Sequence, residues 1–373
     1  VMSKMHRQIY DYFRQQFAQV TNPPIDSLRE AAVMTLETCY GPELNIYEET
    51  ADHAKRLATT SPVLSYRKLN SILNNHYFES AEINLSFNDN SNLQAELKKL
   101  QDEDVRKVKK GASIIHLIED LPKQGSLPIN ALLAVGSVHQ RLVKLGLRSD
   151  ANIIVTTSSA RDTHQIACLI GFGATAVYPT LAYQTLLALT DRNELKGDAH
   201  ENCSRYRKGI NKGLLKIISK MGISTISSYR GSQLFEIVGL DKDVVNLCFT
   251  NTESRIKGKK FKDLDLELRS LNEYARSNIA DMKVGGLLKY IHGGEYHTYN
   301  PEIVKKLQEA VNSGLNSTYQ NYSSLVDNRP PAMLRDLLEI NTGKKQIDIN
   351  KVESQKKILT RFDSAGMLSL IHI

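Results

Sequence analysis

Between residues 111 and 240, short apolar runs alternate with longer amphipathic stretches, and this alternation restricts the fold of the 373-residue chain more than any other feature. The apolar runs include Ser113–Ile118, Asn152–Val155 and Ala174–Tyr178. Runs of four to six residues that are rich in β-branched side chains are typical of strands buried on both faces of a parallel sheet. We therefore predict a strand at each of these three runs.

The stretches between the runs carry apolar residues at helical spacing, and most of them end at a glycine. We predict helices over Ala131–Leu145, Arg161–Ile170, Leu181–Leu189 and Lys208–Lys220. After residue 220 we predict one more unit of the same kind, with a strand at Ile223–Ile226 and a helix at Ser232–Val238. Strands that alternate with helices in this way predict an α/β fold of βα repeats, with a TIM-barrel-like arrangement.

The regions on either side of this repeat are predicted to be mainly helical. The spacing of Ile9, Phe13, Phe17 and Val20 predicts a helix over residues 8–20, which ends at a stiff corner, Thr21–Pro24. Asp26 is a candidate N-cap for a second helix over Ser27–Thr38. Farther along the chain we predict a polar segment with a surface helix in 76–110, helices near 263–277 and 301–313, and a linker over 341–351.

The charge of the chain is positive, at +7 with a pI near 9.0, but it is dispersed. The densest basic runs, Arg106–Lys110 and Lys257–Lys262, contain a single aromatic residue, Phe261, which is a poor platform for stacked bases. We therefore predict no nucleic-acid partner. Because the sequence has neither an apolar stretch of eighteen residues nor a signal-peptide pattern at Val1–His6, we also predict no membrane association and a cytoplasmic location.

No metal site is predicted from the cysteines or the histidines. The four cysteines, Cys39, Cys168, Cys203 and Cys248, lie at least 35 residues apart, and we interpret them as reduced, structural residues. The segment His292–His297 offers two imidazoles and a carboxylate, but its spacing matches no compact metal-site pattern. A turn with hydrogen-bonded histidines is the favoured interpretation.

Two loops are candidates for binding an anion, because each follows a predicted strand and precedes a predicted helix. In Tyr229–Ser232 the side chain of Arg230 is suited to a carboxylate or a phosphate, although an ordinary loop with a surface arginine is the favoured interpretation. The segment Thr156–Asp162 is similar. His139 and His164 fall on predicted helices and are interpreted as packing residues, and no catalytic residue is assigned.

Several long motifs resemble the large subunit of bacterial glutamate synthase, in the order of that family and across nearly the whole chain. They are Tyr12–Glu30, Ala160–Ala176, Gly209–Leu214, Ser219–Ile226, Ser228–Arg230, Leu234–Glu236, Gly286–Tyr290, His292–His297 and Arg361–Ala365.

The resemblance implies an oxidoreductase in which a cysteine domain hydrolyses glutamine and the ammonia passes through an internal channel to a flavin barrel. There the ammonia condenses with 2-oxoglutarate, and FMN reduces the resulting 2-iminoglutarate to glutamate. An iron-sulfur cluster refills the FMN with electrons, either from NADPH through a small subunit that carries FAD or from ferredoxin. The sequence leaves the choice between these two donors open.

By the same resemblance, residues 1–190 correspond to the central domain and residues 200–373 to the first part of the FMN-binding domain. Leu368–Ile373 depart from the family pattern, and we expect them to be an artefact of a truncated gene fragment. Such a piece is expected to be inactive and to bind neither FMN nor the cluster alone. The alternative is a non-catalytic interaction module derived from the same subunit.

The resemblance also implies roles for a few residues. Thr21 and Asn22 are expected near the ammonia channel, where the stiff Pro23–Pro24 turn suits a fixed wall. Ala365, Gly366 and Met367 match the first strand of the flavin barrel and are expected to border FMN. Arg230 is retained as a structural or channel-side residue.

Overall fold

The computed structural model describes residues 7–17, 30–119, 124–277, 285–341, 343 and 347–361. Contacts along the backbone divide the chain into two compact units, one that spans His6–Ala280 and another that includes Asp281–Ile373. This division at Ala280 reflects the compactness of each unit. It does not test the boundary between family domains that we predict between residues 190 and 200, which stays a prediction.

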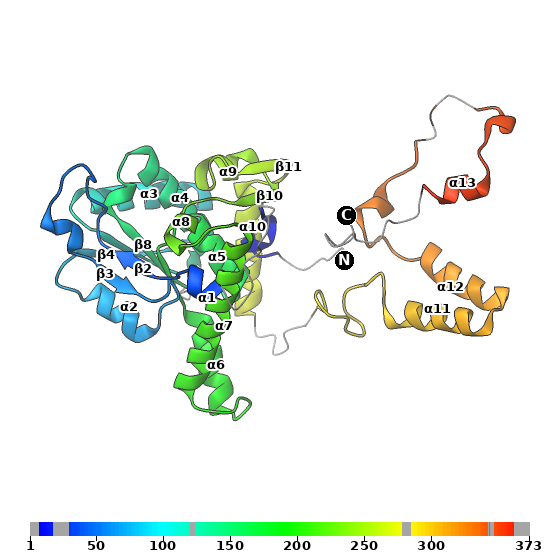
Figure 1. Ribbon diagram of the computed structural model, residues 1–373, viewed down its shortest axis with the longest axis horizontal. Coiled ribbons are helices and arrows are strands. Elements are labelled where there is room, and N and C mark those ends of the chain that lie inside the picture. The colour runs from blue at the N-terminus through cyan, green and yellow to red at the C-terminus, as the bar shows by residue number, and fades with distance from the viewer. Residues whose placement is uncertain are drawn as a thin grey trace. The chain divides into compact units, whose positions relative to one another are not determined.

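The larger unit is built on a parallel four-stranded sheet with the order β4-β6-β8-β9 (Figure 1). Its strands are β4 (Ser80–Asn84), β6 (Ile114–Ile118), β8 (Asn152–Thr157) and β9 (Ala176–Pro179). All three pairs of neighbouring strands are parallel. Ser80 of β4 lies opposite Ile114 of β6, Ile114 lies opposite Asn152 of β8, and Ile154 of β8 lies opposite Ala176 of β9. The α/β class with βα repeats is thereby confirmed, and the described strands form an open sheet, not a closed barrel.

Both faces of this sheet are buried, which explains the continuous apolar runs of its strands. Ile115 and Leu117 of β6 face one core, together with α3 (Leu93–Lys109), α4 (Ala131–Lys144) and α5 (Thr163–Gly171). Ile114 faces a second core. That core includes residues of α2 (Tyr66–Leu73).

Several helices have the capping residues that their sequences predict, although α7 (Ala199–Lys220) begins nine residues before the predicted start. The Asn130 side chain accepts a hydrogen bond from Leu132 N at the start of α4, and Gly146 has a positive φ of 70° just beyond its end. Asp162 and Gln165 form a reciprocal capping box at the start of α5. The predicted helices α4, α5, α6 (Thr180–Asp191), α7, α10 (Phe261–Arg276) and α11 (Pro301–Ser313) are confirmed.

A second, three-stranded sheet has the order β1-β10-β11. Strand β1 (Phe13–Gln15) pairs antiparallel with β10 (Phe235–Leu240), which pairs in parallel with β11 (Glu253–Lys259). The fully buried ring of Phe13 lies among other aromatic rings, at centroid distances of 5.0 Å from Phe172 and 4.8 Å from Phe249. Edge-to-face contacts of this kind bind the first described segment to the core.

Two predicted helices are strands in the structure. Residues 8–20 do not form a helix within the described part, which consists of the 3-10 turn η1 (Ile9–Tyr12) and β1. Pairing with β10 and burial of Phe13 override the helical spacing. The helix predicted over Ser232–Val238 is also wrong, because Phe235–Leu240 forms strand β10, in which the alternating residues Phe235 and Ile237 are buried.

Other local predictions are also corrected. The predicted strand Ile223–Ile226 is reduced to a single bridge between Thr35 and Thr225, followed by the short helix α8 (Ile226–Tyr229). The described part of the helix predicted over Ser27–Thr38 is helical only in α1 (Glu30–Val33). The edge strand β4 lies in a segment for which no strand was predicted.

The remaining elements of the larger unit are short. They are β2 (Thr38–Tyr40), η2 (Ala51–Ala54), β3 (Leu57–Thr59), β5 (Ser86–Asn88), β7 (Ser126–Pro128), η3 (Arg148–Asp150) and α9 (Lys242–Cys248). Strands β2 and β3 form one antiparallel pair, and β5 and β7 form another.

The second unit contains short helical elements, namely α11, α12 (Asn316–Asp327), η4 (Leu334–Leu337), η5 (Ile349–Lys351) and α13 (Gln355–Leu359). Asn300 caps α11, and Gly314 ends it with a positive φ of 63°. Arg329 and Asp336 form an ion pair of 2.9 Å.

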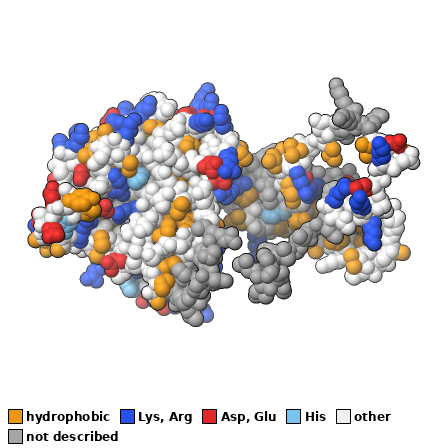
Figure 2. All heavy atoms as spheres, turned by 45° about the horizontal axis from the view of Figure 1, so that its top comes forward, with side chains coloured by type: hydrophobic (Ala, Val, Ile, Leu, Met, Phe, Trp, Pro, Cys, Tyr) orange, Lys and Arg blue, Asp and Glu red, His pale blue; other side chains and the backbone are white. Residues whose placement is uncertain are grey.

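Charged side chains are dispersed over the face shown in Figure 2, in agreement with the scattered basic residues of the sequence. In the part of the chain that the structure describes, none of the helices has the length and apolar character needed to cross a membrane.

Candidate functional site

Apart from Arg230, the residues singled out by the family resemblance lie outside the described residues. These are Thr21 and Asn22, expected at a channel, and Ala365, Gly366 and Met367, expected at FMN. Their roles stay predictions. The described residues do show how the segment that leads to Thr21 is held, and they show the two ends of the parallel sheet.

The segment 7–17 is fastened to the carboxyl end of the sheet by three side-chain contacts. The hydroxyl groups of Tyr10 and Ser159 are 3.1 Å apart. The His164 ring lies 3.1 Å from the Tyr10 carbonyl, and the Gln165 amide donates to the Gln8 side chain at 2.8 Å. A cavity of about 340 Å³ lies beside this segment and is lined largely by apolar side chains, including leucines of α10.

Glu119, which directly follows β6, is the centre of a buried hydrogen-bond network at the same end. Its Oε2 accepts from the hydroxyl groups of Thr157 and Ser159 and from the backbone N–H groups of Ser158 and Ser159. Its Oε1 accepts from Ala131 N at 3.2 Å, at the start of α4. One carboxylate therefore joins the ends of β6 and β8 to the helix α4.

Burial dominates the electrostatics of this network. It raises the pKa of Glu119, while the hydrogen bonds from Thr157 and Ser159 oppose the shift. The pKa of Tyr10 lies well above its ordinary value because the phenol is buried and because Glu119 is near.

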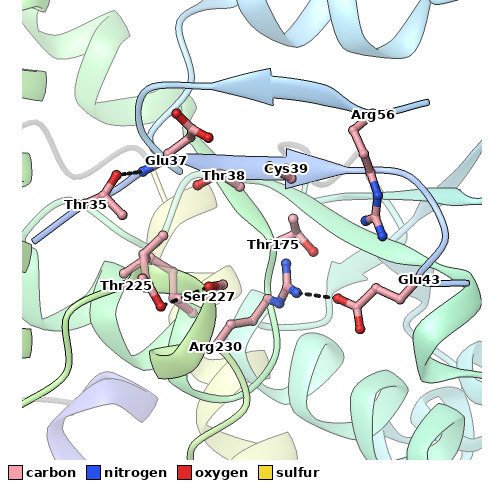
Figure 3. Close-up of a pocket in the computed structure, with 12 residues that line it drawn as sticks. Thr35, Glu37, Thr38, Cys39, Glu43, Arg56, Thr175, Thr225, Ser227 and Arg230 are labelled. Atoms are coloured by element: carbon pink, nitrogen blue, oxygen red, sulfur yellow. Dashed lines mark hydrogen bonds and ion pairs between the residues drawn. The ribbon is translucent and has the colours of Figure 1, made fainter. Parts of the chain in front are cut away.

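The amino end of the sheet is different, because it borders an open cavity of about 310 Å³ (Figure 3). Arg56, which precedes β3, and Arg230, which follows α8, both line it. Arg230 pairs with Glu43 at 3.1 Å. Thr175, just before β9, contributes a hydroxyl group between the two guanidinium groups in this view.

A partly buried arginine, Arg148, lies near Arg230 and the start of β9. Arg148 donates to His139 Nδ1 at 3.0 Å, to the Gly173 carbonyl at 2.8 Å and to the Ala151 carbonyl at 2.5 Å. Burial lowers the pKa of Arg148 to about 10, and the nearby charge of Arg230 adds to that effect. Burial, helped by both arginines, lowers the pKa of His139 to about 3, so this ring is neutral.

Asp104 of α3 is a second buried carboxylate, and its oxygens have no hydrogen-bond partner among the described residues. Burial raises its pKa to about 7, and the charges of Arg148 and Lys107 partly oppose this.

The structure brings the two loops predicted for anions to different places. Ser158 and Ser159 donate to Glu119, so their polar groups serve the protein's own carboxylate. Arg230 lines the open cavity at the opposite end of the sheet. The sequence interpretation missed Glu119, Arg56 and Arg148, and the position of Glu119 directly after a buried strand is the one signal that pointed to it.

The histidines and cysteines that we interpret as structural residues have the following surroundings in the structure. His139 of α4 accepts a hydrogen bond from Arg148, and the ring of His164 of α5 lies 3.1 Å from the Tyr10 carbonyl, so both rings have partners within the protein, as expected of packing residues. His297 lies 2.6 Å from the Gly286 carbonyl in the segment that contains the turn at His292. The four cysteines are free thiols, of which Cys168 and Cys248 are buried.

The parallel βα repeats, with both faces of the sheet covered, define an α/β protein of the βα-repeat class. Residues 1–241 match the family model for the glutamate synthase central domain, and residues 297–370 match a conserved region in glutamate synthase. The chain belongs to the glutamate synthase family.

Individual relatives agree with the family models. The ferredoxin-dependent glutamate synthase of Pyropia yezoensis is 39% identical over 98% of this chain and 25% of its own length. A ferredoxin-dependent glutamate synthase of Arabidopsis thaliana is 37% identical over 98% of this chain and 24% of the relative. The glutamate synthase [NADPH] large chain of Bacillus subtilis is 33% identical over 98% of this chain and 24% of the relative. The chain thus spans about a quarter of the length of these relatives.

Among solved structures, a variant of flavocytochrome b2 with sulfite bound is similar over 54% of this chain and 48% of its own, with a TM-score of 0.31 and 10% identity. At this level the likeness says nothing about function.

Proposed function

We propose that this chain is part of a glutamate synthase that makes L-glutamate from 2-oxoglutarate and ammonia released from glutamine. In this proposal the chain supplies scaffold and a wall of the ammonia channel, with Thr21 and Asn22 at that wall. The whole enzyme would use FMN and an iron-sulfur cluster and would take electrons from ferredoxin or from NADPH through a small subunit with FAD. The division into 1–190 and 200–373 and the cytoplasmic location stay predictions.

The observation that supports this role is the anchoring of the segment 7–17, which leads directly towards Thr21. Strand β1 pairs with β10 from Phe13 to Gln15, and Tyr10 is tied to Ser159 and His164. A wall that guides a small neutral molecule must keep its polar groups fixed, since a shifted carbonyl would open a path to water. A segment with a paired backbone and fully buried anchors meets this need.

No chemical step is assigned to this chain. The residues expected at FMN lie outside the described residues, and Glu119 is fully engaged by the protein's own donors. The flavin would supply the hydride chemistry in the whole enzyme, and the part played by the described residues is to hold their neighbours in place.

The test compares two sources of ammonia in the whole enzyme that carries this chain. In the Asn22→Ala variant, we expect glutamate formation from glutamine to fall several-fold, while formation from added ammonia stays close to that of the unchanged enzyme. The ratio of glutamine hydrolysed to glutamate formed should rise, because ammonia is lost before it reaches the synthase site.

The matched control is Asn90→Ala, an exposed turn residue of the same type on the larger unit. It should leave both activities and their ratio unchanged. If Asn22→Ala lowers the glutamine-dependent and the ammonia-dependent activity equally, or changes neither, the role of this corner as a channel wall is wrong.

A further inference from the structure

The cavity at the amino end of the parallel sheet is formed by elements from distant parts of the sequence. Strand β2, the residue before β3, the residue before β9 and both ends of α8 border it. The Asn152 side chain, at the first position of β8, donates to the Gly41 carbonyl at 2.9 Å and fixes the segment after β2 against the sheet. With a volume of about 310 Å³, the cavity is large enough for a small ligand.

Most hydrogen-bond donors of this cavity are not used by the protein. A guanidinium group has five N–H donors. Within the described residues, Arg56 donates to the Gly41 carbonyl at 3.2 Å, and Arg230 donates to Glu43 at 3.1 Å. Most N–H groups of both side chains are therefore available to a ligand.

Hydroxyl groups add to these donors. Thr175 accepts from Ile153 N at 3.2 Å, and Thr35 accepts from Glu37 N at 3.0 Å. Each of these hydroxyl groups still has its own hydrogen to donate. Figure 3 shows the side chains of Arg56 and Arg230 directed towards the space beside Thr175, with the carboxylate of Glu37 pointing away from it.

The charge of Arg148, which lies near Arg230, is not balanced by a directly bonded carboxylate. The described hydrogen bonds of Arg148 all go to neutral acceptors, and one of them is the carbonyl of Gly173, two residues before Thr175. The carboxylates of Glu43 and Asp104 act on Arg148 through their charge, without a hydrogen bond to it. Glu43 is also the carboxylate that pairs with Arg230, and it is itself half exposed. Among the described residues Arg56 has no carboxylate partner, so its guanidinium group can pair with an anion in the cavity.

We propose that this cavity binds a small oxyanion, through a phosphate or a carboxylate group held between Arg56 and Arg230. Guanidinium groups bind such oxygens through paired, charge-assisted hydrogen bonds, and Thr175 supplies an additional donor. The site lies at the opposite end of the sheet from the segment 7–17, so it is separate from the proposed channel.

The test is a calorimetric titration of the 373-residue chain with inorganic phosphate and, separately, with glutarate, in a low-salt buffer without other oxyanions. We expect saturable binding of at least one of them. Binding of phosphate alone assigns the site to phosphate compounds, and binding of glutarate alone assigns it to dicarboxylates. Arg56→Gln and Arg230→Gln should each weaken binding roughly 10-fold or more, since each removes a charged donor.

Two further variants separate a lost site from lost folding. Arg192→Gln, at an exposed arginine beyond α6, should bind as the unchanged chain does. Glu43→Gln removes the carboxylate that competes for Arg230 and should tighten binding several-fold, an effect that misfolding cannot produce.

Absence of saturable binding of both anions would overturn the proposal. Equal binding by the unchanged chain and by a folded Arg56→Gln variant would overturn it as well, and so would weaker binding by Glu43→Gln. Thermal unfolding of each variant establishes which of them are folded.

Discussion

The two ends of the parallel sheet handle buried charge in opposite ways. At the carboxyl end, Glu119 accepts five hydrogen bonds from the residues around it. At the amino end, Asp104 accepts none among the described residues, and the described bonds of Arg148 go to neutral groups. In parallel α/β proteins the carboxyl end is the usual place for ligands.

The difference indicates which end is structural and which is open to ligands. A fully satisfied carboxylate fixes the elements around it and leaves no donor for a substrate. Guanidinium groups beside a cavity whose N–H groups are only partly used by the protein can bind solvent or an anion there. In this chain the carboxyl end therefore serves to anchor the segment 7–17, whereas the amino end has the capacity to bind.

The largest expected effect comes from breaking the network of Glu119. The Glu119→Ala variant removes the acceptor of five hydrogen bonds. The N–H groups of Ala131 and Ser158 lose their acceptor, whereas Ser159 N and the hydroxyl groups of Thr157 and Ser159 can still pair with one another. We therefore expect the free energy of unfolding to fall by about 3 kcal/mol. Urea unfolding of the variant and the unchanged chain measures this loss.

The matched comparison is Glu194→Ala, at an exposed glutamate after α6 whose nearest cation is 4.0 Å away. It should change the free energy of unfolding by less than about 0.5 kcal/mol. If Glu119→Ala is as mild as this control, the carboxyl end is not held by its carboxylate, and the contrast between the two ends fails.

The second prediction concerns the pH dependence of the amino end. Asp104 keeps its proton up to about pH 7 in the folded chain, because burial raises its pKa, whereas in the unfolded chain it loses the proton near its ordinary pKa of 3.8. The folded state thus binds one proton more than the unfolded state between these values, so this group makes stability fall as pH rises through that window. The charges that face it, those of Arg148, Lys107 and Glu103, modify the shift without reversing it.

The Asp104→Asn variant does not titrate, so it should gain stability relative to the unchanged chain as pH rises from 5 to 8. We expect a relative gain of about 2 to 3 kcal/mol over this range, less than the whole pKa shift implies, because the range begins above the ordinary pKa of the unfolded state. The cost of burying the new amide does not depend on pH, so it lowers both ends of the profile equally. Unfolding curves at several pH values measure this gain, with the exposed Asp102→Asn as the control. Parallel profiles for Asp104→Asn and the unchanged chain would show that Asp104 is ionised and compensated in the folded state.

Three of the four strands of the parallel sheet were predictable because they are mostly buried and therefore leave a strong local signal, whereas the more exposed edge strand β4 was not predicted. Strands β6, β8 and β9 are apolar runs between helices with clear glycine stops, and these features depend on neighbours in the sequence. Strands β1 and β10 were mistaken for helices because their apolar residues also fit helical spacing, and the choice between the two periods depends on a pairing partner more than 200 residues away.

The sites were less predictable than the fold for a similar reason. The donors to Glu119 include residues 38 to 40 positions away, and Arg230 meets Glu43 across 187 positions. A single sequence carries no information on such distances. Arg230 was singled out as following a strand, whereas in the structure it follows the short helix α8, and its proximity to the cavity results from the β2–β3 hairpin.

The smallest expected effect tests how far the anchoring of the segment 7–17 at the carboxyl end of the sheet depends on a single hydroxyl group. Tyr10→Phe removes the hydroxyl group that lies 3.1 Å from Ser159 but keeps the fully buried ring. Because the Ser159 hydroxyl still donates to Glu119, no donor or acceptor of the network is left without a partner. We therefore expect a loss of about 1 kcal/mol in the free energy of unfolding.

Tyr47→Phe, at a side chain that is 88% exposed, should have no measurable effect and provides the baseline. A loss near 3 kcal/mol for Tyr10→Phe would mean that the segment 7–17 depends on this one hydroxyl group and not on the pairing of β1 with β10. In that case a weakly held segment would lie next to Thr21, and a fixed channel wall at that corner would lose its structural support.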